Sequence, residues 1–306
     1  MAAEHRIKME NSGVRLPADM PWFEQQIKQI RHRAWLLRQC LRKGKRPPVL
    51  YVWPEFPSKR AALYKMARSL GWELTNVPRG AALGGIRFED TTEQIPQNST
   101  WPANMQSSRV WNDRCSDIRK TTLERAHVKA FGYGMAVNPI THDGLMVVKS
   151  DENAKHDGQL VQGPLDSENV CSDVVYQLNI NNRDDSGRYY DYRIVWIGGQ
   201  IPLIYQKFKV PDARFTNATV DAKILPDVSQ VLSNSELEAI RHLTSIMCVD
   251  YAELDALRDR QSGRLFVVDV NPTPWGPPAG LNRASAEEAI HRMAQCLKDQ
   301  LLPSSK

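Results

Sequence analysis

Residues 251–274 read YAELDALRDRQSGRLFVVDVNPTP, two apolar runs separated by a polar turn that contains a glycine. This pattern is typical of a β-hairpin. Because side chains alternate between the two faces of a strand, Asp269 and Asn271 are expected to project together from the second run. Hairpin pairing would bring Asp255, on the first run, alongside them.

Two carboxylates and an amide oxygen are hard ligands of the kind that hold Mg²⁺ in proteins, with waters and phosphates completing the coordination. We therefore treat Asp255, Asp269 and Asn271 as candidate metal ligands. The alternative is a hairpin whose acids are merely solvated, and the short motif Asp-x-Asn taken alone favours that alternative.

The positive charge of the chain is concentrated at its start. Residues 1–46 contain eleven Lys and Arg against four Asp and Glu, whereas the whole chain of 306 residues carries a net charge of +5. Between Pro21 and Leu41 the apolar residues recur at spacings of four and three, which predicts an amphipathic helix. We expect this helix to dock on the protein with its basic face in solvent; an anionic partner and a homodimer contact are the alternatives. No nucleic-acid-binding motif accompanies it, which disfavours a nucleic-acid partner.

The composition indicates a cytoplasmic globular protein. No run reaches the length of a membrane span, and the first residues lack the apolar stretch of a signal peptide. The five cysteines are widely spaced and form no Cys-x-x-Cys pair, so neither a disulfide framework nor a zinc site is expected.

The first half of the chain contains a small βαβ-like pattern. We predict a strand at 49–53, a helix at 58–70, a second strand at 72–75 and a long loop from Pro78 to Pro102. A βαβ pattern favours a parallel sheet covered by helices.

The second half alternates helices and strands. We predict helices at 112–130, 235–247 and 285–302, with Ser233 or Asn234 capping the second of them. Strands are expected at 145–149, 174–178, 192–196 and 201–207, and Gly198-Gly199 is expected to form a hairpin turn.

Several of these elements occur in an order that resembles the ATP-grasp superfamily, in particular its carboxylate-amine ligases. The residues that carry the resemblance are Lys149 in its strand, Asp191-Tyr-Arg193, Arg214-Phe-Thr-Asn217, Asp255 and Asp269-Val-Asn271. The resemblance covers roughly Val110 to Gln300. It implies an α+β fold in which two subdomains hold ATP between them. We accordingly expect a basic helical segment at 1–46, a small α/β domain at 47–110 and the ATP-grasp domain at 111–306.

The resemblance also implies roles for individual residues. Asp255, Asp269 and Asn271 would hold Mg²⁺, with Mn²⁺ as an alternative, and Lys149 would contact the nucleotide instead of simply extending to solvent. Arg193 would face phosphate or the acyl substrate, the alternative being an ion pair with Asp191. Less specific matches are Arg214 and Asn217 near the phosphates, and Gln177 and Leu178 on a strand that recognises adenine.

The chain departs from the family pattern in three places. The last metal-binding acid is Asp269 where the family usually has Glu. The loop from Asp151 to Gly158 has a single glycine, so its polar side chains, Asn153, Lys155 and His156, are candidates to cover the nucleotide. A lysine expected near the first helix of the domain has three candidates, Arg114, Lys120 and Lys129.

The function implied by the resemblance is an ADP-forming carbon-nitrogen ligase. Such an enzyme uses ATP and Mg²⁺ to activate a carboxylate as an acyl phosphate, which an amine then attacks. The alternatives are a kinase of the same fold that phosphorylates a small molecule and a non-catalytic nucleotide-binding protein. Trp275, in the proline-rich turn after Asn271, either stacks on an acceptor or belongs to a rigid strand exit.

Overall fold

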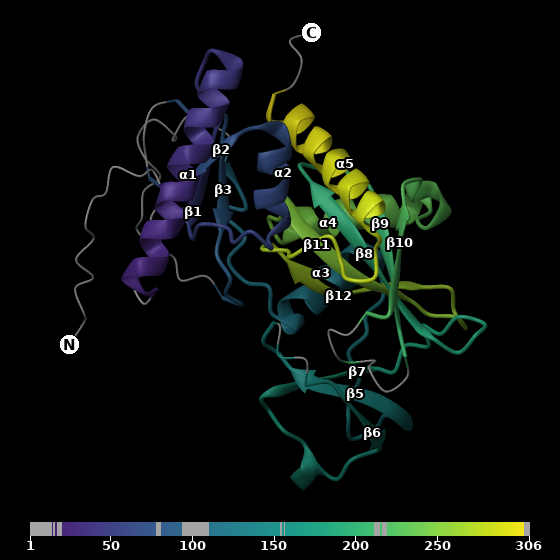
Figure 1. Ribbon diagram of the computed structural model, residues 1–306. Coiled ribbons are helices and arrows are strands. Elements are labelled where there is room, and N and C mark those ends of the chain that lie inside the picture. The colour runs from purple at the N-terminus through teal and green to yellow at the C-terminus, as the bar shows by residue number, and fades with distance from the viewer. Residues whose placement is uncertain are drawn as a thin grey trace, which may run out of the picture.

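The structure is a computed structural model that describes residues 14, 16, 20–77, 81–93, 110–153, 155, 157–210, 215 and 219–302. Within these residues the chain forms three β-sheets and five α-helices (Figure 1). The predicted mixed α/β architecture is confirmed. The division at residues 46 and 110 stays a prediction.

The first sheet is parallel and has the strand order β2-β1-β3-β4. Its strands are β1 (Val49–Pro54), β2 (Glu73–Thr75), β3 (Gly85–Phe88) and β4 (Val110–Trp111). The predicted β1-helix-β2 unit is confirmed, with α2 at Ala62–Leu70. The long loop predicted from Pro78 was wrong in its middle, because β3 lies there between β1 and β4. Its four residues are too few to show a periodic pattern, and they are buried between neighbours on both sides.

The predicted N-terminal helix is present as α1 (Trp22–Lys43), but the expected docking face was wrong. Phe23, Ile30, Leu37 and Leu41 are 70%, 63%, 61% and 77% exposed. The buried side carries Gln29 and His32, whose Nε2 lies 3.7 Å from Glu73 Oε1. The indole of Trp35 stacks under the Arg68 guanidinium at 3.7 Å. Polar and cation-π contacts therefore hold α1, and its apolar stripe faces away from the protein.

The second sheet is antiparallel and small, with the order β6-β5-β7. It consists of β5 (Gly144–Ser150), β6 (Gln159–Gly163) and β7 (Val174–Leu178). A 3₁₀ helix at Ser167–Asn169 lies between β6 and β7. The strand β6 was not predicted, because its exposed sequence QLVQG has no apolar alternation.

The predicted helix at 112–130 begins eight residues later than expected, as α3 (Lys120–Phe131). The side chain of Asn112 instead binds the backbone of the neighbouring strand, accepting from the N–H of Tyr251 at 2.9 Å and donating to its carbonyl at 2.7 Å. Asn112 has a φ of 57°, which ends regular structure at that point.

The third sheet is antiparallel with the order β10-β9-β8-β11-β12. Its strands are β8 (Tyr189–Ile197), β9 (Ile204–Lys209), β10 (Asp221–Leu225), β11 (Tyr251–Arg258) and β12 (Leu265–Asn271). A 3₁₀ helix, Val228–Gln230, and α4, Asn234–Ile246, follow β10. Ser233 caps α4 through a capping box with Glu236, as the sequence predicted for Ser233.

The two faces of the third sheet have different partners. The apolar side chains of one face, including Ile194 and Leu254, form a core with α3 and α4. On the other face, Val195, Tyr205 and Tyr251 share a core with the first sheet, α2 and α5 (Arg283–Leu301). Polar side chains continue this second face beyond the shared core. No helix in the described part of the chain is long and apolar enough to cross a membrane.

Candidate functional site

The predicted hairpin is confirmed as β11 and β12, and it brings the three candidate metal ligands onto one face of the third sheet. Asp255 pairs with Asp269 across the hairpin, and Glu253 pairs with Asn271. On its other side Asp255 pairs with Arg193 of β8. Because paired residues of an antiparallel ladder point to the same face, these side chains form one polar cluster.

Asp255 is the centre of this cluster. Arg193 donates to it through Nε at 2.8 Å and Nη2 at 3.0 Å, a two-point contact. Lys207 donates to both carboxylate oxygens, at 3.2 and 3.3 Å. Burial raises the pKa of Asp255, but Arg193 and Lys207 outweigh it and hold that pKa well below its usual range. Asp255 is therefore ionised at any physiological pH.

Arg193 does not pair with Asp191, the alternative that the sequence left open. Its third contact is Glu253, with Nη1 3.3 Å from Oε2. Asp191 instead pairs with Lys209 at 3.0 Å. The guanidinium thus lies between two acids of β11.

Glu253 is a cluster residue that the sequence interpretation missed. Lys207, together with Lys209, was a residue that the sequence left open between the cleft and solvent. Glu253 is only 2% exposed and Lys207 only 4%. Burial raises the pKa of Glu253 to about 7. The spacing of Glu253 from Asp255 does place both on one face of a strand, but only the packed structure shows that this face is covered.

Asp269 sits in a different electrostatic environment. Burial raises its pKa, and the facing carboxylate of Asp255 raises it further, while Lys120 and Lys149 act in the opposite direction. Burial, and next the charge of Lys120, lower the pKa of Lys149 to about 8. Two carboxylates and two amines from different elements therefore converge at this end of β12.

Among the three candidates for the upstream lysine position, the structure brings Lys120 to the cluster. Lys120 starts α3, is 9% exposed, and donates to the backbone carbonyl of Glu152. Arg114 and Lys129 are exposed. Which of the three basic residues lies beside the cluster was therefore visible only in the folded structure.

The donor set of Asp255, Asp269 and Asn271 fits a hard divalent cation in chemistry. The close approach of two carboxylates, which raises the pKa of Asp269, is the repulsion that a cation would relieve. The Asn271 Oδ1 atom accepts from the Thr273 N–H at 2.9 Å, which fixes the orientation of the amide. The described residues contain no group of three or more His, Cys, Asp or Glu side chains that could hold a metal, so any metal here would depend on the amide oxygen and on ligands from outside the protein.

The strand β7 carries the residues predicted to recognise adenine. Gln177 is 5% exposed and pairs with Val147, two residues before Lys149 on β5. The N–H of Leu178 is already used, because it donates to the Met135 carbonyl at 2.7 Å. Gln177 lines a pocket of about 560 Å³ between β7 and α3. The side chain of Gln177 therefore faces this pocket, whereas the N–H of Leu178 is already bonded within the protein.

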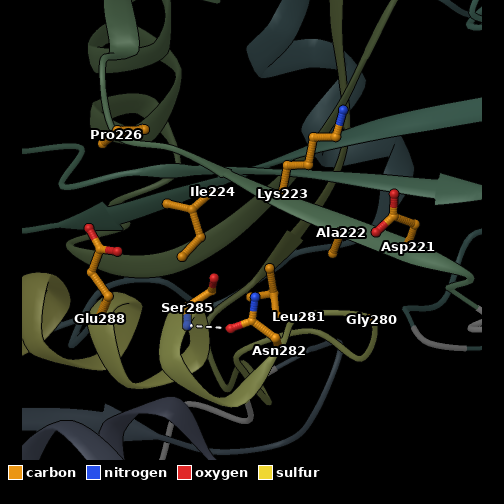
Figure 2. A pocket seen from close by; sticks show the side chains of 10 residues that line it. All are labelled: Asp221, Ala222, Lys223, Ile224, Pro226, Gly280, Leu281, Asn282, Ser285 and Glu288. Carbon is orange, nitrogen blue, oxygen red and sulfur yellow. Dashed lines mark hydrogen bonds between the residues drawn. The ribbon is translucent and has the colours of Figure 1, made fainter.

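A second pocket, of about 490 Å³, lies between β10 and the start of α5 (Figure 2). Lys223 and Glu288 line it from these two elements, and Asn282 caps the helix by accepting from Ser285 N at 2.9 Å. Ala222, also in the lining, pairs with Lys207. The pocket therefore continues the strand face that carries the polar cluster.

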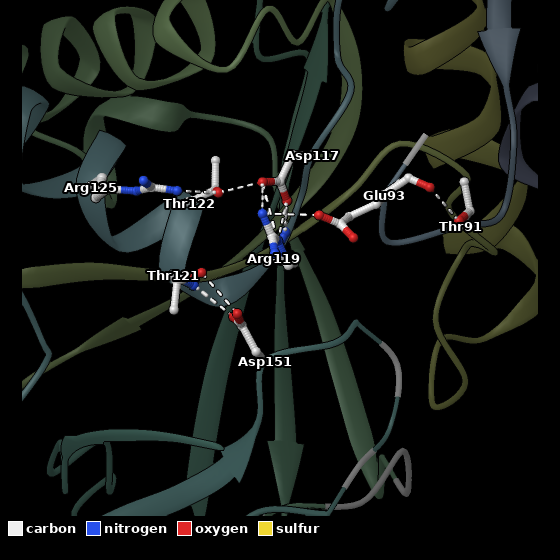
Figure 3. Close-up of polar contacts among 8 residues, drawn as sticks. All are labelled: Thr91, Glu93, Asp117, Arg119, Thr121, Thr122, Arg125 and Asp151. Atoms are coloured by element: carbon white, nitrogen blue, oxygen red, sulfur yellow. Dashed lines mark hydrogen bonds and ion pairs between the residues drawn. The ribbon is translucent and has the colours of Figure 1, made fainter. Parts of the chain in front are cut away.

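The loop after β5 is tied to the rest of the protein by polar contacts (Figure 3). Asp151 accepts from the N–H and Oγ1 of Thr121, both at 2.8 Å. The N–H of Asn153 donates to Oγ1 of Thr92 at 3.0 Å, and Thr92 lies in the segment that follows β3. Lys155 pairs with Glu152 at 2.7 Å on the surface. Predicted residues His156, Arg214 and Asn217 lie outside the described residues.

The proline-rich turn after Asn271 docks on the start of α2. The Ala62 N–H donates to the Pro274 carbonyl at 2.9 Å, and Lys65 Nζ donates to the Gly276 carbonyl at 2.5 Å. Trp275 is 56% exposed, with the Arg60 guanidinium 5.5 Å from its ring. The turn thus joins the first sheet to the strand that carries the candidate metal ligands, and Trp275 remains open to solvent.

No protein-family model matches the chain, and no curated protein matches it in sequence. Solved structures match it in fold. The ATP-grasp ligase PsnB complexed with minimal precursor superposes with a TM-score of 0.51 at 11% identity, covering 83% of this chain and 99% of that one. PsnB complexed with a phosphomimetic variant of minimal precursor, Mg and ADP gives 0.51 at 11% identity, covering 83% and 98%. D-alanine–D-alanine ligase from Bacillus anthracis complexed with ATP gives 0.48 at 12% identity, covering 84% and 97%. The likeness to PsnB shows that the chain has the ATP-grasp fold, as the sequence resemblance implied.

Proposed function

We propose that this protein is an ATP- and Mg²⁺-dependent, ADP-forming ligase that joins a carboxylate to an amine. The observation that carries the proposal is the facing pair Asp255 and Asp269, surrounded by cations of four elements: Arg193, Lys207, Lys120 and Lys149. Burying charges of both signs in one cluster costs free energy of folding, and such clusters with perturbed pKa values gather at functional sites that bind charged ligands. A nucleotide with its metal is such a ligand.

The fold supports this interpretation of the cluster. PsnB, which shares the fold, is described in complex with Mg and ADP. A bound Mg²⁺ would be held by Asp255, Asp269 and Asn271 and would supply neutralisation of charge on phosphate oxygens. Lys149 and Lys120 would attract the phosphates, and Gln177 would contact the base. Roles for Arg214 and Asn217 beside the phosphates belong to the same proposal.

Arg193 is the group proposed to orient the substrate carboxylate. Its two-point contact with Asp255 and its contact with Glu253 fix the guanidinium in one orientation. Because the guanidinium is already fixed, Arg193 loses no further side-chain entropy when it binds a carboxylate. Arg193 would hold the acid so that one of its oxygens can attack the γ-phosphorus of ATP.

In the proposed reaction, the attacking carboxylate oxygen forms a bond to the γ-phosphorus as the bond between that phosphorus and the ADP oxygen breaks. The amine nitrogen then attacks the acyl carbon, phosphate leaves, and the nitrogen loses a proton to water. No protein side chain forms a covalent bond in either step. The chain supplies position and charge, which are the main contributions a protein makes to phosphoryl transfer.

The test is release of ADP in the presence of MgATP, hydroxylamine and pools of carboxylic acids, including peptides with acidic side chains. An acyl phosphate is intercepted by hydroxylamine as a hydroxamate, and we expect one to form with at least one pool. Asp269→Asn is the loss-of-function comparison, and Trp22→Glu, on the distant helix α1, is the control that should retain activity.

A stable phosphorylated product that hydroxylamine does not trap would instead identify a kinase of the same fold. MgATP binding without turnover in any pool would favour the non-catalytic alternative. Failure to bind MgATP at all would reject the proposed site.

A further inference from the structure

The exposed apolar stripe of α1 has the repeat of a coiled-coil seam. This α1 seam consists of Phe23, Ile27, Ile30, Ala34, Leu37 and Leu41. Phe23, Ile30 and Leu37 recur every seven residues, and so do Ile27, Ala34 and Leu41, which is the heptad repeat of helices that supercoil around each other.

The α1 seam is free to meet another helix. The protein holds α1 through the opposite side of the helix, where His32 and Gln29 are buried. The helix lies at the edge of the molecule (Figure 1). Its buried side contacts Arg68 of α2 and Glu73 of β2. Four large apolar side chains of the α1 seam, each more than half exposed, are more than a monomer usually presents along one helix.

We propose that the α1 seam is the interface through which two copies of this chain associate, as an antiparallel helix pair. With the middle of each helix at the two-fold axis, Phe23 lies opposite Leu41 of the second copy, and Ile27 lies opposite Leu37. Ile30 lies opposite Ala34, so a large side chain meets a small one. The symmetry repeats each pairing, which makes the α1 seam complementary to itself along its whole length.

The charges beside the α1 seam favour the antiparallel arrangement. In heptad terms Glu24 and Arg38 occupy equivalent flanking positions, and in the antiparallel pair each Glu24 faces Arg38 of the second copy. A parallel pair would place Arg33 beside Arg38 twice, without an opposite charge on either side. Flanking charges of this kind determine the orientation and the partner of paired helices.

Two pairs of like charges also lie beside the α1 seam, and they predict how self-association depends on salt. Near the two-fold axis Arg31 faces its own copy, and so does Arg33. Salt screens this repulsion together with the Glu24–Arg38 attraction, while it leaves apolar burial in place. Because α1 carries six Lys and Arg against one Glu, the repulsion between the two copies outweighs the attraction. Self-association should therefore strengthen as salt is added.

The principal test is sedimentation velocity of the full chain over a range of concentrations at low and high salt. We expect a monomer–dimer equilibrium that Ile30→Glu with Leu37→Glu weakens by roughly a hundredfold or more, because charged groups would enter an apolar layer. Trp22→Glu is the matched control: Trp22 is 73% exposed on the same helix but lies outside the α1 seam, so the dimer should persist. Since all three side chains are exposed, the thermal unfolding of the monomer should not change.

Two further variants separate this proposal from its rivals. Arg31→Gln with Arg33→Gln should tighten the dimer at low salt. When an oxidant such as oxidised glutathione is supplied, Gln26→Cys should form a disulfide with the native Cys40 of the second copy, because the two positions face each other only in the antiparallel pair.

A chain that stays monomeric at every concentration and salt would overturn the proposal, as would a dimer that the seam variants leave unchanged. A synthetic helix with an apolar seam flanked by glutamates serves as the competing probe. If the monomer binds that probe, with affinity that falls as salt rises, the α1 seam is a site for an acidic partner and the proposal is wrong.

Discussion

Asp255 and Asp269 face each other across one hairpin, yet neutralising them is expected to affect the stability of the protein very differently. The perturbation is the substitution of each aspartate by asparagine, which preserves shape and removes one negative charge. Asp255 is held by Arg193 and by Lys207, whereas no described residue donates a hydrogen bond to Asp269. The two variants therefore remove charges that the fold uses in opposite ways.

Asp255→Asn leaves two cations without their shared counter-charge, and one of them, Lys207, is only 4% exposed. Breaking a buried pair by removing one partner typically costs about 3–5 kcal/mol. For a chain of this size about 1 kcal/mol lowers the midpoint of thermal unfolding by roughly 2–4 °C, so we expect a loss of roughly 6 °C or more.

Asp269→Asn removes a charge whose ionisation the fold already opposes, since burial and Asp255 raise the pKa of its carboxyl. Its attraction to Lys120 and Lys149 is lost at the same time. We expect the two effects to nearly cancel, leaving the free energy of unfolding within about 1 kcal/mol of the native value. The change should tend toward stabilisation.

The assay is thermal unfolding with and without MgATP. A ligand at a hundred times its dissociation constant stabilises the native protein by about 2.7 kcal/mol, and this gain should vanish in Asp269→Asn although that variant is well folded. The reasoning is refuted if both variants lose the same stability without ligand, or if Asp269→Asn retains the full MgATP-induced shift.

Three other outcomes can be measured on the same protein. Affinity for ATP should fall as the pH rises through about 8, because burial lowers the pKa of Lys149 to about 8 and only the protonated amine attracts phosphate. Isothermal titrations at pH 7 and pH 9 measure this fall. The variant Lys149→Arg stays charged and should abolish it. Burial raises the pKa of Glu253 from 4.5 to about 7, so the folded state binds more protons than the unfolded state between these pH values, and the free energy of unfolding falls as the pH rises from 4.5 to 7. In urea unfolding, Glu253→Gln should remove about 3 kcal/mol of this decrease. A variant with the same pH profile as the native protein would contradict the prediction. Ser233→Ala should destabilise the protein by about 1 kcal/mol through loss of the capping box, whereas the exposed Ser172→Ala should have no measurable effect.

The sequence predicted best those features that are set by neighbours in the chain. The hairpin of β11 and β12 joins two apolar runs through a short turn, so its pairing is local, and it brought Asp255 beside Asp269 as expected. The cap of α4 is likewise a four-residue pattern. Features of this kind need no knowledge of what covers a surface.

The sequence failed where distant packing decides the outcome. The apolar stripe of α1 predicted a docked face, but the contact of His32 with Glu73 and the stacking of Trp35 on Arg68 hold the other face, and the stripe stays exposed. The four residues of β3 are too few for periodicity to register, and the exposed strand β6 has no apolar alternation. Lys207 was left open between solvent and the site, because a lysine on a strand says nothing about whether an opposite charge lies next to it.

The unusual ionisation of the site follows from where it lies on the third sheet. Tyr251 belongs to the apolar core shared with the first sheet, and the same face of β11 continues through Glu253 to Asp255. Glu253 is therefore the last side chain under the cover of that core and has the raised pKa of a buried acid. Asp255, one step further, meets Arg193 and Lys207 and stays ionised. The boundary between core and cluster thus separates two acids of one strand: burial raises the pKa of Glu253 to about 7, whereas Arg193 and Lys207 keep Asp255 ionised.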